Sequence, residues 1–83
     1  MKWTVIWKSD AERQLTSLWL SSRRRQSIKE AAEELDRAAA WNPIQLGESR
    51  EMDERIVIIR PLAARIKVIE SAQTVFVLGV WEF

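Results

Sequence analysis

The sequence predicts a two-layer α+β domain in which a helical hairpin packs on one face of a β-sheet. Three observations predict it: a strand pattern opens the chain, two amphipathic helical patterns with a short connection follow, and three more strand patterns with tight turns close it. These elements can bury their apolar faces together as one helical layer on one sheet. The length of 83 residues fits a single domain over residues 1–83.

The first strand is expected over residues 3–8. Trp3, Val5 and Trp7 alternate with the residues between them, and β-branched and aromatic side chains dominate the segment. Because both sets of side chains are largely apolar, we expect this strand to occupy a well-covered position in the sheet.

The helical hairpin is expected over residues 9–40. The first helix begins at Ser9, where Ser9 and Glu12 have the spacing of a capping box, and it runs to about Leu20. The second helix covers residues 23–40 and ends before Pro43, because the residue preceding a proline is disfavoured in helical geometry.

The last third of the chain reads as an antiparallel meander. Arg60-Pro61-Leu62 and Ser71-Ala72-Gln73 are short enough to be hairpin turns. The expected strands cover residues 55–60, 64–70 and 74–81, and a short edge strand is expected at about residues 49–52.

The composition excludes several chemistries. The chain has no Cys and no His, so we expect no disulfide, no thiolate zinc site, no histidine-based catalysis and neither a metal nor a cofactor. No apolar run approaches the length of a membrane span, so we expect a cytoplasmic protein with no membrane partner. The net charge of +1 means that any affinity for nucleic acid depends on local clusters of cations.

One such cluster is predicted on the sheet. Alternation places Arg65, Lys67 and Ile69 on one side of their strand, and the helices can cover only one sheet face. If that side is uncovered, the cations can meet a polyanion, and Arg50 could reach the same rim. The alternative interpretation is an ordinary solvated sheet face.

The ordered set of motifs resembles the RelE/ParE superfamily of type II toxin-antitoxin toxins. The residues that carry the resemblance are the opening strand that leads into Ser9-Asp10-Ala11-Glu12, the Asn42-Pro43 break, Gly47-Glu48-Ser49-Arg50, Arg60-Pro61-Leu62, Ala64-Arg65-Ile66-Lys67-Val68 and the closing strand Val75-Phe76-Val77-Leu78-Gly79-Val80-Trp81. The chain looks especially like short members of the plasmid-stabilisation type.

The resemblance implies one of two activities. RelE-like members cut mRNA in the ribosome, and ParE-like members inhibit DNA gyrase without RNA chemistry. In the first case Arg65 matches the family's strand arginine and would stabilise phosphate charge, with Lys67 assisting, while Arg50 and Arg60 would hold the RNA backbone. These cations suit the charge that develops on a phosphodiester during cleavage.

The sequence departs from the nuclease pattern in one respect. It contains no His and no Tyr, whereas the nucleases place such a residue near their C-terminus; Glu82 is the ionisable residue in this tail. Three interpretations therefore stay open: an mRNA interferase, a gyrase inhibitor, and an inactive homologue that retains antitoxin binding.

All three interpretations imply a cognate antitoxin as partner. An apolar groove beside the helical hairpin, or a sheet edge, would accept its helix or strand. Trp19, Trp41 and Trp81 are the expected anchors, because aromatic side chains dominate the energetics of interfaces.

Overall fold

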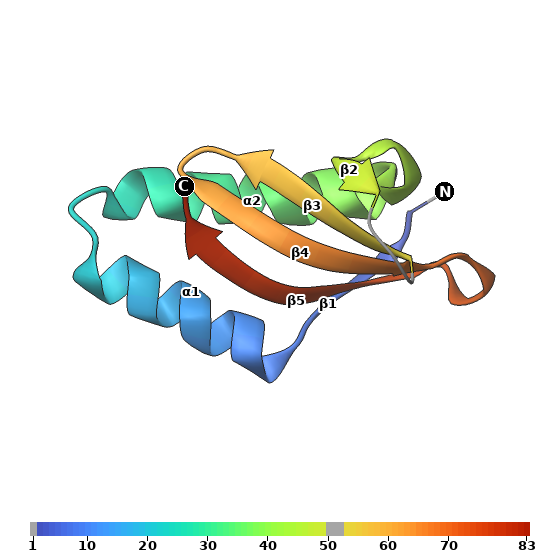
Figure 1. The fold of residues 1–83 in the computed structure, drawn as a ribbon, viewed down its shortest axis with the longest axis horizontal. Coiled ribbons are helices and arrows are strands. Elements are labelled where there is room, and N and C mark those ends of the chain that lie inside the picture. The colour runs from blue at the N-terminus through green and yellow to red at the C-terminus, as the bar shows by residue number, and fades with distance from the viewer. Residues whose placement is uncertain (1, 50–52) are drawn as a thin grey trace.

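A computed structural model describes residues 2–49 and 53–83 and has the predicted α+β architecture. Figure 1 shows the sheet lying in front of α2, with α1 extending from the turn that joins the two helices. The elements in chain order are β1 (Thr4–Trp7), α1 (Ser9–Ser21), α2 (Arg25–Trp41), the 3-10 turn η1 (Pro43–Gln45), β2 (Glu48–Ser49), β3 (Glu54–Ile59), β4 (Leu62–Ile69), the 3-10 turn η2 (Glu70–Ala72) and β5 (Thr74–Glu82).

Within the described residues, five strands form one mixed sheet in the order β1-β5-β4-β3-β2. The predicted meander is confirmed, since β3, β4 and β5 pair antiparallel in sequence order. β1 pairs parallel with β5 and lies at the edge of the sheet. The expectation of a well-covered first strand was therefore wrong: Trp3, Val5 and Trp7 pack against the core, but Ile6 on the other side is 41% exposed.

The helix ends differ slightly from those predicted. Ser9 is the first residue of α1 and not its cap, because Lys8 occupies the cap position and no side chain caps the helix. Between the helices, the Ser22 hydroxyl accepts a hydrogen bond from the amide of Arg24 at 2.9 Å. In the described part of the chain, neither helix is long and apolar enough to cross a membrane.

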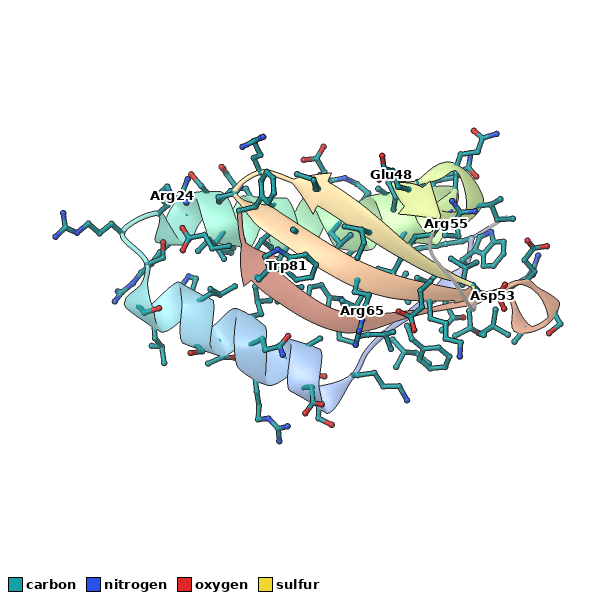
Figure 2. The ribbon with its side chains drawn as sticks, in the orientation of Figure 1. Arg24, Glu48, Asp53, Arg55, Arg65 and Trp81 are labelled. Atoms are coloured by element: carbon teal, nitrogen blue, oxygen red, sulfur yellow. The ribbon has the colours of Figure 1, made fainter. Side chains whose placement is uncertain are left out.

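The turn between the helices is tied to the end of the sheet. Arg24 lies beside this turn (Figure 2), and its Nε donates to Glu82 Oε2 at 3.1 Å. The Ser22 hydroxyl lies 3.3 Å from the same carboxylate oxygen. Because these side chains are partly solvent-exposed, the pair orients the end of β5 more than it stabilises the fold.

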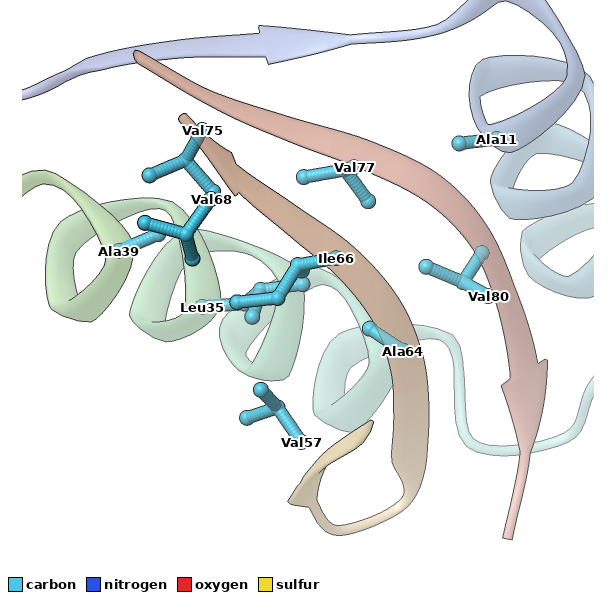
Figure 3. Packing of buried hydrophobic residues seen from close by; sticks show 10 residues of the cluster. All are labelled: Ala11, Leu35, Ala39, Val57, Ala64, Ile66, Val68, Val75, Val77 and Val80. Carbon is cyan, nitrogen blue, oxygen red and sulfur yellow. The ribbon is translucent and has the colours of Figure 1, made fainter. Parts of the chain in front are cut away.

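The core lies between the helices and one face of the sheet (Figure 3). Ala39 of α2 is fully buried, and the small side chain lets the helix approach the valines of the strands closely. Full burial of a side chain such as Ile66 contributes about 1.5–3 kcal/mol. The buried cluster consists of Ala11, Leu35, Ala39, Val57, Ala64, Ile66, Val68, Val75, Val77 and Val80.

Candidate functional site

The candidate site lies on the open face, the side of the sheet turned away from the helical core. Arg65 and Lys67 alternate with the buried Ile66 and Val68 along β4, as the sequence predicted. The Arg65 side chain is 53% exposed, and Lys67 is half-buried. The predicted cations therefore stand on the face that the helices leave uncovered.

A β-bulge shapes the open face beside Arg65. Arg65 pairs with Gly79, but its neighbour Ile66 pairs with Val77, so Leu78 is an extra residue in β5. The extra residue reverses the alternation along the rest of the strand. Trp81 consequently lies on the open face with Arg65, as Figure 2 shows, and Glu82 lies on the helical side.

The bulge borders a hollow of about 380 Å³ between β5 and α1. Gly79 leaves room for the Gln14 side chain, since a Cβ there would stand 3.0 Å from Oε1 of Gln14. Oε1 in turn accepts a hydrogen bond from the amide of Val80 at 2.9 Å. The hollow is lined by Asp10, Gln14, Arg65, Leu78, Gly79, Val80 and Trp81.

A carboxylate faces the two cations. Glu54 pairs with Lys67 across the β3–β4 ladder, and its Oε1 lies 3.6 Å from Nε of Arg65. This partly exposed ion pair offsets part of the positive potential around Arg65. Glu54 was not predicted from the sequence, although the two-residue turn at Arg60-Pro61 determines a register that places it opposite Lys67.

Arg60, the further predicted RNA-binding arginine that falls within the described residues, lies apart from Arg65. Arg60 stands in the β3–β4 turn, with its guanidinium 4.7 Å from the centre of the Phe83 ring. Three residue pairs separate this turn from the Arg65 pair, about 10 Å along the strand. Arg50 lies outside the described residues.

The three tryptophans expected to anchor an antitoxin lie on two sides of the molecule. Trp19 lines an apolar groove of about 350 Å³ between α1 and α2, with Leu15, Ile28 and Ala32. Trp41 is 68% exposed at the end of α2 and lines an adjoining groove of about 610 Å³ that shares Ala32. Trp81 lies on the open face, so a single straight helix cannot contact all three.

The charged groups on the open face suit the stabilisation of negative charge. Within residues 2–49 and 53–83, no group of three or more carboxylates gathers that could hold a metal ion. Glu82 is turned toward Arg24 and away from Arg65. The open face carries the exposed guanidinium of Arg65, the ammonium of Lys67 and the carboxylate of Glu54. The indole of Trp81 lines the hollow beside them.

Comparisons with known proteins identify the fold. Neither the models of protein families nor the curated proteins give a match to this chain. Among solved structures, the RelBE2 toxin-antitoxin complex from Mycobacterium tuberculosis matches with a TM-score of 0.81 and 17% identity, over 100% of this chain and 93% of that one.

Two further structures agree with it. The E. coli RelBE toxin-antitoxin complex matches with a TM-score of 0.68 and 17% identity, over 98% of this chain and 96% of that one. The chromosomal ParDE system of P. aeruginosa matches with a TM-score of 0.71 and 13% identity, over 96% and 95%. The structural neighbours are thus RelE and ParE toxins, and the chain has their fold.

Proposed function

We propose that this protein is the toxin of a type II toxin-antitoxin system and that its open face binds mRNA on the ribosome. The likeness to RelE and ParE toxins over nearly the whole of each chain supports the first part. The observation that carries the second part is the position of Arg65, which is exposed beside the hollow between β5 and α1.

The proposed reaction is cleavage of a phosphodiester by the neighbouring ribose 2′-hydroxyl. The 2′-oxygen bonds to phosphorus, the bond to the 5′-oxygen of the next nucleotide breaks, and a cyclic phosphate remains. Arg65 and Lys67 stabilise the negative charge that develops on the phosphorus oxygens. Glu54, in contact with Arg65, is placed to take the proton of the 2′-hydroxyl.

The leaving 5′-oxygen also needs a proton, and the chain has no His or Tyr to supply it. A general acid typically contributes about 10²–10⁴-fold to a rate. In this proposal water or the ribosome protonates the oxygen, and the toxin contributes orientation and charge, which can carry a large share of the acceleration.

A second function is favoured by the apolar side chains on the open face. Ile58 is 49% exposed and Trp81 is 41% exposed, and Phe83 at the end of β5 is 50% exposed. Such side chains suit contacts with a protein. A ParE-like inhibitor of DNA gyrase would use this face without any RNA chemistry.

We propose that the antitoxin docks on the two grooves of the helical side. The groove at Trp19 is mainly apolar, and the adjoining groove at Trp41 also carries Lys2, Asp36 and Arg37. An amphipathic helix with apolar residues toward Trp19 and mixed charges toward Trp41 would fit the two grooves in sequence. A further segment would be needed to reach Trp81.

Induced expression with parallel measurement of translation, message integrity and DNA supercoiling tests the function. The mRNA proposal expects growth to stop together with translation, and messages to be cleaved. Continued translation with altered supercoiling would favour the gyrase alternative. Normal growth at high expression would contradict both and indicate an inactive homologue.

Replacing Glu82 with glutamine should leave growth inhibition within about twofold of the original, because this carboxylate faces Arg24 and not the hollow. The free energy of unfolding should fall by less than about 1 kcal/mol, as expected for a partly exposed pair. Titration of growth against expression level, together with urea denaturation, measures the two effects. Loss of toxicity in a fully folded Glu82→Gln variant would show that the tail carboxylate takes part in the chemistry.

A further inference from the structure

We propose that the hollow beside Arg65 binds one unstacked guanine base of the RNA and that Gln14 and Asp10 of α1 recognise it. This inference rests on the proposed RNA-binding function and deepens it, since it assigns a base preference to the same face. Proteins that read RNA sequence commonly stack splayed-out bases on aromatic side chains and bond their polar edges.

The hollow has the shape that such a base requires. Its volume of about 380 Å³ can hold a purine ring. Gly79 carries no side chain, and the amide end of Gln14 lies in the space that a Cβ there would need, so a ring entering the hollow meets this amide. Trp81, which is 41% exposed, lines the same hollow and offers a stacking surface.

Gln14 presents a hydrogen-bond donor whose orientation is set by the backbone. Its Oε1 accepts a hydrogen bond from the amide of Val80 at 2.9 Å, which leaves its Nε2 group as a donor for a ligand. Nε2 lies 4.0 Å from the position that a Cβ on Gly79 would occupy, at the floor of the hollow. A carbonyl oxygen of a base can accept a bond from it.

Asp10 supplies the matching acceptor. It precedes Gln14 by four residues on α1, so the two side chains are neighbours on one face of that helix, and both line the hollow. Arg13 pairs with Asp10, which holds the carboxylate and offsets part of its charge.

A donor beside a carboxylate matches guanine better than the other bases. The edge of guanine carries the O6 acceptor next to two N–H donors, which can bond an amide group and a carboxylate together. Adenine presents an amino donor in place of O6. Because Arg65 lines the same hollow, a base held there has its own phosphate within reach of the guanidinium.

The test is a nuclear magnetic resonance titration of ¹⁵N-labelled protein with the trinucleotides UGU, UAU, UCU and UUU. We expect UGU to bind about tenfold more tightly than UAU, the difference that one or two neutral hydrogen bonds provide. The side-chain amide of Gln14 and the indole N–H of Trp81 should shift with UGU, and the same amide should shift little with UAU.

The variant Gln14→Glu separates recognition from structure. It keeps the oxygen that accepts from Val80 but replaces the donor by a carboxylate, so the preference for UGU should vanish while the thermal midpoint stays close to that of the original protein. Gln26→Glu adds the same charge to an exposed position on α2 and should leave the preference unchanged.

The variant Arg65→Ala distinguishes the inference from the function on which it rests. It should weaken all four trinucleotides about equally, because a phosphate contact carries no sequence information. The guanine site would be overturned if the original protein bound all four trinucleotides equally, or if the guanine preference persisted in Gln14→Glu. The RNA function would still stand in either case, provided that Arg65→Ala weakens binding. No effect of Arg65→Ala would overturn both.

Discussion

Replacing Gly47 with alanine is expected to lower the free energy of unfolding by about 2–4 kcal/mol. Gly47 has a φ of +70°, a backbone conformation that residues with a Cβ rarely adopt. An added Cβ would stand 2.2 Å from the carbonyl oxygen of Ile56 and 2.9 Å from a methyl group of Val57. Both neighbours belong to β3, so the clash can be relieved only by moving β3 or the entry into β2.

The matched control is Gly79→Ala in β5. Its nearest obstacle is the end of the flexible Gln14 side chain at 3.0 Å, and we expect a loss below about 1 kcal/mol. Urea denaturation followed by tryptophan fluorescence and by circular dichroism measures both variants. For a domain of this size, each kcal/mol corresponds to about 4–8 °C in the thermal midpoint. Equal midpoints for the two variants would contradict the assignment of Gly47 as the strained position.

The predictable parts of the fold are those set by local patterns. The alternation in β1 and β4 correctly separated core-facing from outward-facing side chains, and Ile66 and Val68 are buried where Arg65 and Lys67 are not. Helix and strand types follow from apolar periodicity over several residues, and this signal survives small errors at the ends.

The burial of β1 could not be predicted, because it depends on how β1 pairs with strands that are distant in the sequence. An apolar strand looks the same at the centre and at the edge of a sheet, and the parallel pairing of β1 with β5 joins segments about 70 residues apart. The predicted Ser9 cap failed for a different reason: a helix start can shift by one residue when the backbone before it is already extended, as at Lys8.

The bulge at Leu78 decided what could be predicted of the candidate site. Strict alternation from the buried Val75 and Val77 would place Trp81 in the core and Glu82 on the open face. Because of the extra residue, Trp81 lies on the open face and Glu82 lies on the helical side. Leu78 itself lines the hollow beside Arg65. Gly79 is the sequence signal that was available, since a glycine inside a strand often marks a bulge or a close approach.

Replacing Arg65 with alanine is expected to abolish growth inhibition and to reduce cleavage of messages on the ribosome by about 10²–10³-fold. The guanidinium is the exposed cation that lines the hollow. Its Nε lies 3.6 Å from Oε1 of Glu54, and this ion pair orients it. The change should alter the free energy of unfolding by less than about 1 kcal/mol, because a half-exposed side chain in a long ion pair stabilises little.

Arg65→Lys sharpens the interpretation of that loss. Lysine keeps the positive charge but lacks the planar fork that bonds two phosphate oxygens at once, so its activity should fall between those of the original protein and of Arg65→Ala. Cleavage assayed with purified ribosomes and a defined message gives the rates, and circular dichroism confirms folding.

Full activity in a folded Arg65→Ala variant would contradict the phosphate-binding role of Arg65. It would favour a function carried by the apolar side chains of the same face. In that case Trp81→Ala should be the more damaging change, because a protein-binding surface draws most of its affinity from buried aromatic side chains.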